Sequence, residues 1–350
     1  TVQPSAAVGK NLIINGDMRI DQRNNGASAT SNATTYMTDR FQLQMSSVTN
    51  VQTYQQVTDA PAGFNNSLKI TNNSTTQATA AGVLCTPRQK IEGLNTAYLN
   101  WGTSDAQTVT ISFWVKASVT GTYPVSLINN DFTRSFVTNY TVSVANTWEK
   151  KTVTIAGDTS GTWTVDNSTG ISVMFSLDTG STYQTTAGSW QTGNYRGTSS
   201  DVHFLANASA TWQITGLQLE ANTTETPFEH LQYGQQLALC QRYYEQINTR
   251  GTGSETLGVG IVQSSTSARF YIKYSQVKRA EPTISSSSDF TKFLTQSGSA
   301  TNQPTGFSSG GGNLQSCYVF FTISGHTVGQ GIMLLGRNTG VASLKIESEL

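Results

Sequence analysis

Short segments in which apolar and polar residues alternate recur along the chain. In TVTISFWVKAS (108–118), Val109, Ile111, Phe113 and Val115 stand at every second position. Because successive side chains of a β-strand point to opposite faces, this spacing predicts a strand with one buried face. The same pattern recurs in five other segments: GISVMFSLD (Ile171, Val173, Phe175, Leu177), WQITGLQLE (Trp212, Ile214, Leu217, Leu219), ARFYIKYSQ (Phe270, Ile272, Tyr274), CYVFFTIS and ASLKIESEL. In the second of these, Gly216 interrupts the alternation and predicts a bulge or bend.

Turn residues separate these segments, in GTYP, NND, AGDTSG, DTGS and SGGGN. Many short strands joined by turns rich in Gly, Asn and Ser are typical of β-sandwiches and β-barrels. Strands and helices do not alternate along the chain, which argues against a parallel α/β sheet. The sequence therefore predicts an all-β protein.

One segment breaks this pattern, because PFEHLQYGQQLALCQRYYEQIN (227–248) gathers long helix-forming side chains. Apolar residues spaced four and three apart predict one stripe along a helix: Tyr233, Leu237, Cys240, Tyr244 and Ile247. About two heptads are too few for an independent coiled coil, so we expect this interface helix to pack on other structure. That structure is either the sandwich of the same chain or a neighbouring subunit.

The helix divides the chain into two β regions. We expect a first domain over 11–230, a connecting helix over 231–249 and a second β domain over 250–350. Residues 1–10 are predicted to form a short N-terminal attachment arm that becomes ordered only against a partner.

The charge balance limits the classes of partner. Charged residues make up 12% of the chain, and 21 Lys plus Arg match 21 Asp plus Glu. A nucleic-acid-binding protein needs a basic surface, so we expect no nucleic-acid partner. No run of 18 apolar residues occurs, so we expect no membrane insertion. The three cysteines, Cys85, Cys240 and Cys317, fit neither a disulfide framework nor a zinc spacing, and are expected as core residues, with one disulfide as the alternative.

Catalytic motifs are weak in this sequence. His203, His230 and His326 lack the close spacing of metal-binding or catalytic histidines. LDTG at 177–180 matches one Asp-Thr-Gly loop of aspartic proteases, which need two carboxylates that share a proton. The nearest second copy, DTSG at 158–161, departs from that motif, and Asp and Gly are common turn residues. We therefore predict no enzymatic activity, no catalytic residues and no cofactor.

Aromatic residues in polar stretches are better candidates for binding. Trp163, Trp190 and Tyr195 lie in GTWTV and AGSWQTGNYRG. An exposed ring beside hydroxyl and amide groups suits a sugar, because the ring packs on the apolar C–H face of a pyranose. Alternatively, these rings cover the sandwich edge or contact a sister subunit. Trp114 and Trp148, in or beside strand patterns, are expected in the core.

Four segments resemble a family of phage and prophage virion surface proteins, which includes tail-fibre-like and receptor-binding members. They are KNLIINGDMRIDQRNNG (10–26), YMTDRFQL (36–43), WQITGLQLEANTTETPFEHLQYGQQLALCQRYYEQI (212–247), and KRAEPTI (278–284) with the terminal ESEL. The third is the most specific, with a Gly-Leu-Gln-Leu-Glu strand, a Pro-Phe-Glu turn and a helix that contains Cys-x-Arg-Tyr-Tyr.

The resemblance implies an N-terminal jelly roll like that of carbohydrate-binding modules, one connecting α-helix and a C-terminal β-sandwich. It implies a homotrimer on the virion surface, assembled in the host cytoplasm, whose arm contacts capsid or tail proteins and whose jelly roll recognises a host surface polysaccharide. The alternative is a capsid decoration or head-fibre protein that reinforces the shell. Some related jelly rolls hold calcium, but Asp17 and Glu220 are the only obvious carboxylates here, so no metal site is predicted.

Overall fold

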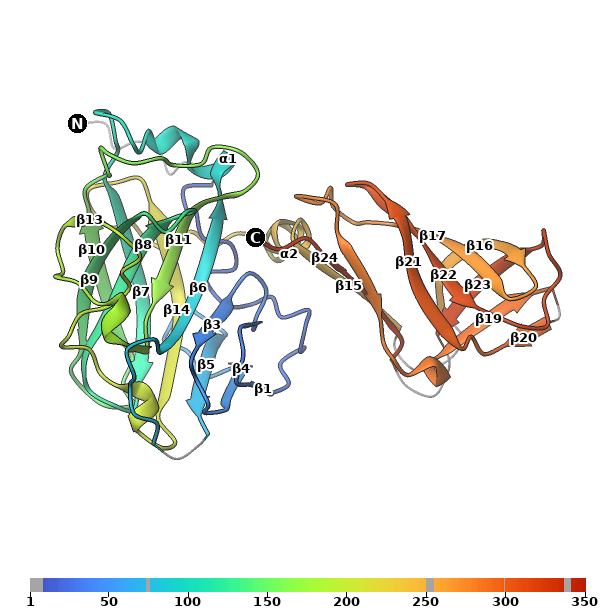
Figure 1. Ribbon diagram of the computed structural model, residues 1–350, viewed down its shortest axis with the longest axis horizontal. Helices are drawn as coiled ribbons and strands as arrows, with labels where there is room; N and C mark the ends of the chain where they lie inside the picture. The colour runs from blue at the N-terminus through green and yellow to red at the C-terminus, as the bar shows by residue number, and fades with distance from the viewer. Residues whose placement is uncertain (1–8, 74–75, 250–254, 299, 337–340) are drawn as a thin grey trace. The chain divides into compact units, whose positions relative to one another are not determined.

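The computed structural model describes residues 9–73, 76–249, 255–298, 300–336 and 341–350 (Figure 1). Strands dominate the described residues, which confirms the predicted all-β fold. The chain divides into two compact units, residues 1–236 with Leu350 and residues 237–349.

Helical structure is confined to short segments. No helix in the described ranges is long and apolar enough to cross a membrane. The helical segments are α1 (Gly93–Thr96), α2 (Tyr233–Gln241) and the 3-10 turns η1 (Ala97–Leu99), η2 (Ser181–Tyr183), η3 (Phe204–Ala206) and η4 (Phe290–Lys292).

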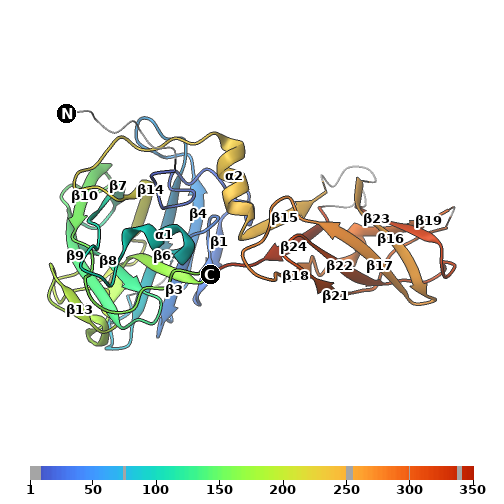
Figure 2. The ribbon, with the colours of Figure 1, turned by 90° about the horizontal axis from the view of Figure 1, so that it is seen from above.

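The first unit is a jelly-roll sandwich of two antiparallel sheets (Figures 1 and 2). One sheet has the order β1-β4-β5-β14-β7-β10, and its strands are β1 (Ala29–Ser31), β4 (Gln52–Val57), β5 (Ser67–Asn72), β14 (Thr211–Glu220), β7 (Val109–Ala117) and β10 (Glu149–Ile155). The other has the order β13-β9-β8-β11-β6-β3-β2, and its strands are β13 (Trp190–Thr192), β9 (Arg134–Val142), β8 (Gly121–Asn129), β11 (Thr169–Phe175), β6 (Leu84–Glu92), β3 (Gln42–Ser46) and β2 (Thr35–Tyr36), with β12 (Asp178–Thr179) paired to β6.

The core of the first unit lies between these sheets. On β7 the alternating residues Val109, Ile111, Phe113 and Val115 are all fully buried in it, as predicted. The predicted bulge in β14 is also present, since its register against β7 shifts between Thr215 and Gln218. Period-two spacing thus identified the inward faces of these strands correctly.

Trp114 and Trp148 do not lie in the core, and that expectation was wrong. Trp114 is half-buried because it alternates with Phe113 and Val115 and so points to the outer face of β7. Trp148 precedes β10, and its indole N–H donates to Asp59 Oδ1 at 3.2 Å. The tryptophan at the centre of the core is Trp212, which is fully buried.

The predicted helix over 231–249 is wrong in its second half. α2 ends at Gln241, and Tyr244–Asn248 forms strand β15, which pairs with β24 (Ser343–Glu347). Tyr244 and Ile247 therefore lie on a strand, not on a helical stripe. Their helical spacing was overridden because β24 supplies a complete set of backbone partners about 100 residues further along the chain.

The second unit is also built from two antiparallel sheets. A three-stranded sheet has the order β15-β24-β18, where β18 is Thr283–Ser286. A seven-stranded sheet has the order β20-β19-β23-β16-β17-β22-β21, and its strands are β20 (Ala300–Asn302), β19 (Phe293–Ser297), β23 (Gly331–Gly336), β16 (Glu255–Ser264), β17 (Ser267–Lys273), β22 (Ser316–Thr322) and β21 (Gly306–Gly312). Phe270, Phe293 and Phe321 are fully buried in its core.

The segments that carry the family resemblance converge in each unit. In the first, Asn11 donates from Nδ2 to the Leu217 carbonyl, and its Oδ1 accepts from the Leu219 N–H at 3.0 Å. Glu229 accepts from the backbone of Gly9 and Asn11. Residues 1–8 of the predicted arm lie outside the described part of the chain.

In the second unit, the fully buried Lys278 forms an ion pair with Glu245 at 2.6 Å and donates to the Gln241 carbonyl. Arg279 donates to the carbonyls of Ser348 and Glu349. These motif residues therefore fasten distant segments of the fold together, and do not form an exposed binding surface.

Candidate functional site

Three tryptophans gather at one place in the jelly roll. Trp101 follows the η1 turn, Trp163 lies in the loop between β10 and β11, and Trp190 begins β13. Their ring centroids are 4.8 Å (Trp101–Trp163), 5.3 Å (Trp101–Trp190) and 5.4 Å (Trp163–Trp190) apart, in edge-to-face pairs. Trp101 is buried beneath the other two, which are half-buried. We call Trp101, Trp163 and Trp190 the tryptophan cluster.

Backbone acceptors fix the orientation of all three indoles. The ring N–H groups donate to Gln107 O at 2.8 Å from Trp101, to Ser160 O at 3.2 Å from Trp163, and to Ala156 O at 2.8 Å from Trp190. Because each indole donor is already used, the parts of Trp163 and Trp190 that face solvent offer mainly apolar carbon surface.

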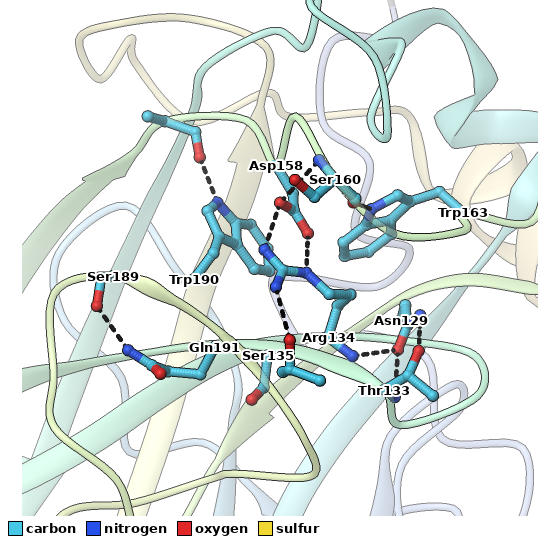
Figure 3. A network of polar contacts seen from close by, with 12 residues as sticks. Asn129, Thr133, Arg134, Ser135, Asp158, Ser160, Trp163, Ser189, Trp190 and Gln191 are labelled. Carbon is cyan, nitrogen blue, oxygen red and sulfur yellow. Dashed lines mark hydrogen bonds and ion pairs between the residues drawn. The ribbon is translucent and has the colours of Figure 1, made fainter.

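An ion pair lies beside the half-buried indoles of Trp163 and Trp190 (Figure 3). The Arg134 guanidinium donates from Nε and Nη2 to the two carboxylate oxygens of Asp158, each at 2.7 Å. The Asp158 side chain is 2% exposed and the Arg134 side chain 15%. The bond to Asp158 raises the pKa of Arg134 above its usual value. Such a two-pronged bond holds the guanidinium in one orientation.

The third nitrogen of Arg134 faces the exposed edge of the site. Its Nη1 donates to Thr192 Oγ1 at 3.3 Å, and Thr192 is exposed at the end of β13. Nearby, Gln191 Nε2 donates to Ser189 Oγ at 2.8 Å (Figure 3). The site therefore combines half-buried indoles with exposed hydroxyl and amide groups. Beside them, Arg134 and Asp158 form an ion pair of fixed geometry whose charges cancel.

This arrangement is suited to binding rather than to proton transfer. The Asp158 carboxylate accepts from Arg134 and from the Ser160 N–H at 3.1 Å, so it is fully engaged. Asp178 of the LDTG segment is buried, and accepts from Thr79 Oγ1 and the Leu205 N–H. Each Asp of the two related loops thus holds its own segment of chain.

The structure brings Trp163 and Trp190 together but leaves Tyr195 apart from them. Tyr195 is half-buried after β13, its N–H donates to Ser135 Oγ at 3.2 Å, and it has no ring contact with another described aromatic residue. Sequence reasoning missed Trp101, Arg134 and Asp158 as members of the site. Their only signal was their type, because they lie on separate segments that the fold brings together.

The segment 180–201 runs along the β9 edge of the β13-to-β2 sheet and reaches the outer face of that sheet where Arg196 donates to Gln44 Oε1. Gly188 and Gly193 donate N–H bonds to the carbonyls of Val137 and Thr133 next to or on β9, at 2.9 and 2.8 Å. Between this segment and β9 lies an open, polar hollow of about 610 Å³, lined by Asn139, Ser181, Gln184, Thr185, Thr186, Ala187, Thr198, Ser199 and Ser200. Asn139 Oδ1 is buried there without a hydrogen-bond partner.

The five residues predicted for the interface helix do not share one environment. Tyr233 is 58% exposed, Leu237 is half-buried and Cys240 is buried, all on α2. Tyr244 is buried and Ile247 half-buried, both on β15. They are therefore not a continuous apolar stripe.

The remaining polar candidates have structural partners. Asp17 forms an ion pair with Arg19, and Glu220 accepts from the Thr226 N–H at 2.8 Å. His203 lies 3.3 Å from Asp178. Within the described ranges, no group of three or more His, Cys, Asp or Glu side chains is placed to hold a metal ion.

No family model and no curated protein matches this sequence. Among solved structures, a putative sugar binding protein from Bacteroides thetaiotaomicron is 15% identical with a TM-score of 0.34, and the match covers 61% of this chain and 100% of that one. The enzymatically active domain of tailspike protein 4 from bacteriophage CBA120 is 11% identical with a TM-score of 0.31, and the match covers 60% of this chain but only 21% of that one. A family 11 carbohydrate-binding module from Clostridium thermocellum is 11% identical with a TM-score of 0.26, over 59% of this chain and 96% of that one. Likeness at this level transfers no function to this chain.

Proposed function

We propose that the first unit binds a glycan at the tryptophan cluster and Arg134. The observation that carries this proposal is the pair of half-buried, mutually packed indoles of Trp163 and Trp190, beside a guanidinium that Asp158 holds in place (Figure 3). A pyranose needs an apolar ring for its C–H face and oriented donors and acceptors for its hydroxyls. The indole carbons meet the first need, and Arg134, Thr192 and Gln191 meet the second.

The biological setting that we propose is a non-enzymatic phage virion surface protein that recognises a host polysaccharide. The resemblance of four segments to phage virion proteins supports this setting, and the fully engaged carboxylate of Asp158 is consistent with binding without hydrolysis. Immunogold labelling of intact phage particles tests the location of the protein, and shows whether it lies on the head or on the tail. Release of reducing sugar from host polysaccharide would contradict the non-enzymatic assignment.

Substitution of the two half-buried tryptophans of the cluster tests the glycan site. We expect Trp190→Ala and Trp163→Ala each to weaken binding to the best ligand of a glycan array roughly fivefold to tenfold, since an aromatic contact contributes about 1 to 1.4 kcal/mol. The matched control is Trp148→Ala, which removes another half-buried indole of the same unit away from the cluster. Equal binding by all three variants would contradict the site.

A second candidate function, that of a capsid decoration or head-fibre protein that reinforces the shell as a homotrimer, is favoured by a different observation. On the outer face of the seven-stranded sheet, Met333, Val259, Tyr271 and Tyr318 are direct cross-strand neighbours on four adjacent strands. Their exposed fractions are 38%, 58%, 56% and 36%. A contiguous apolar row at the middle of a sheet is typical of a surface covered by another protein chain.

Light scattering on the full chain tests this second function. We expect the wild-type mass to correspond to three chains, and Tyr271→Asp to dissociate them because it places a charge in the buried contact. Lys273→Asp is the matched control, because Lys273 is an exposed residue two positions along β17. A monomeric wild-type mass at micromolar concentration would count against this function.

A further inference from the structure

Two arginines lie side by side on the outer face of the β13-to-β2 sheet. Arg88 is on β6, and Arg196 is in the segment 180–201, which reaches this face at Arg196. Both donate from Nη1 to one acceptor, Gln44 Oε1 on β3, at 2.8 Å from Arg88 and 3.0 Å from Arg196. Gln44 points outward because its neighbour Leu43 points into the core.

Among the described residues, neither arginine has an acidic partner. Arg88 also donates from Nε and Nη2 to Gln42 Oε1, at 2.8 and 2.5 Å. Arg196 donates from Nη2 to Asn194 Oδ1 at 2.9 Å, and its guanidinium lies 5.3 Å from the ring centre of Phe132 and 5.4 Å from that of Tyr183. Every acceptor around the two cations is thus a neutral amide.

Both side chains are nevertheless buried. Arg88 is 6% exposed and Arg196 is 2% exposed. Arg196 Nε has no hydrogen-bond partner in the part of the chain that the structure describes. A buried charge usually requires an opposite charge and full hydrogen bonding, and removal of that partner is strongly destabilising. This pair has no opposite charge, and Arg196 Nε has no bond, so neutral amides alone accept the hydrogen bonds of two neighbouring positive charges.

Burial of the two charges lowers the pKa of each guanidinium. Burial lowers the pKa of Arg88 to about 10. Burial lowers the pKa of Arg196 to about 10 as well, with a further contribution from the charge of Arg88. Both groups still carry their charge at neutral pH, so an anion between them would relieve the repulsion.

We propose that Arg88 and Arg196 bind the carboxylate of an acidic sugar residue, such as a uronic acid, in the glycan that the first unit recognises. The inference rests on the proposed glycan-binding function of this unit, but not on the tryptophan cluster. A carboxylate matches the planar fork of a guanidinium and can accept bonds from both arginines at once.

The surroundings of the pair favour a sugar carboxylate over a polyphosphate. Gln42, Gln44 and Asn194, whose amides accept from the two arginines, are half-buried. When a carboxylate takes their place as acceptor, each amide is released to bond sugar hydroxyls. The half-buried rings of Phe132 and Tyr183 add apolar surface beside Arg196. A nucleic acid would instead require a row of basic side chains along its backbone.

Titration calorimetry of the full chain against matched oligosaccharides tests the proposal. The probes are an oligogalacturonate, the neutral galactose oligomer of equal length, and sodium sulfate. We expect the oligogalacturonate to bind at least tenfold more tightly than the neutral oligomer, and this preference to decline with salt. Equal affinity for the two oligomers would overturn the proposal. So would saturation by sulfate that the oligogalacturonate does not displace, because the site would then hold an inorganic anion.

Variants assign the preference to the arginine pair. Arg88→Gln and Arg196→Gln should each abolish the tenfold preference, and Arg196→Lys should retain part of it because the charge remains. Arg269→Gln, in the second unit, is the matched control. Because each Gln variant removes an uncompensated charge, we expect the unliganded thermal midpoint to be unchanged or higher. If a Gln variant does not fold, the wild-type preference and its salt dependence still decide the question.

The combined results of the tryptophan and arginine variants distinguish a failure of the arginine site from a failure of the proposed tryptophan site. If Trp190→Ala lowers the affinity for both oligomers equally, both proposals stand. If Trp190→Ala has no effect while the arginine variants lose the preference, the tryptophan cluster is not the glycan site but the arginine site stands. Preference for the acidic oligomer that persists in both Gln variants would overturn the arginine site alone.

Discussion

At the scale of the residue, charged side chains fall into compensated and uncompensated groups. Arg134 with Asp158 and Lys278 with Glu245 are ion pairs in which each buried charge has its counter-charge. Arg88 and Arg196 share a neutral amide instead. Buried charge without a counter-charge destabilises a fold, and this unusual feature is the basis of the proposed acidic-sugar site.

Asp201 gives a pH prediction for the first unit. Burial raises the pKa of this carboxyl to about 6 from 3.8, against the opposing effect of its bonds from Thr198. Between these two pKa values the folded state binds more protons than the unfolded chain, so stability falls as pH rises through this window. We expect the contribution of Asp201 to be most favourable near pH 4 and lost above about pH 6.

Asp201→Asn provides the matched comparison, because it cannot ionise and keeps one acceptor oxygen for Thr198. Urea unfolding followed by tryptophan fluorescence at several pH values should give a less negative slope of stability against pH in this variant. Parallel curves for wild type and variant would show that Asp201 ionises normally in the folded state.

At the scale of the element, some features follow from the residues within a few positions, and others follow from pairing with a strand far along the chain. The bulge in β14 follows from Gly216, which adopts φ +60°, a conformation that L-residues rarely take. α2, by contrast, ends at Gln241, before the predicted end of the helix, because the residues of β15 pair with β24. A local feature that needs no distant partner can be predicted from the sequence. A segment whose residues suit both a helix and a strand takes the structure for which the fold supplies backbone partners.

Gly216→Ala tests the bulge. An added Cβ would meet the Phe64 ring at 2.6 Å, in a backbone conformation already unfavourable for alanine. Gly188→Ala is the control, since its φ of +97° is also positive but no atom lies within 4 Å of the added Cβ. We expect both to lower the free energy of unfolding, by about 1 kcal/mol for Gly188→Ala and by clearly more for Gly216→Ala. Equal losses would mean that contact with Phe64 contributes nothing.

At the scale of the whole molecule, the described residues form two hydrophobic cores that share no residue. One is built around Trp212 and Phe113, and the other around Phe270 and Phe321. All six tryptophans of the chain, at 101, 114, 148, 163, 190 and 212, lie in the first unit. Tryptophan fluorescence therefore reports on the first unit, while circular dichroism reports on both.

This separation predicts two unfolding transitions with independent responses to mutation. Lys278→Ala leaves Glu245 buried without its partner, and should destabilise the second unit by about 3–5 kcal/mol. We expect its circular dichroism transition to move to lower temperature while the tryptophan transition stays unchanged. Phe113→Ala should do the reverse. A shift of both transitions by either variant would show that the units unfold as one.

The candidate site was predictable only in part. Trp163 and Trp190 stood out because aromatic residues in Ser-, Thr- and Gly-rich stretches are unusual. Arg134 and Asp158 gave no such signal, because an arginine at the start of a strand and an aspartate in a turn occur in most β-proteins. Nothing in the sequence singled out Arg88 and Arg196, since a sequence does not show whether a charged side chain has an oppositely charged neighbour in the fold.

The sequence alone determined the all-β fold, the inward faces of the core strands and the bulge at Gly216, because these depend on period-two spacing and on backbone preferences within a few residues. Tertiary structure decided the rest. It placed Trp114 outside the core, divided 227–248 between a helix and a strand, and gathered Trp101, Arg134, Asp158, Trp163 and Trp190 into one site. The physical reason is that ion pairs, ring contacts and strand pairing join residues that the chain keeps tens to hundreds of positions apart.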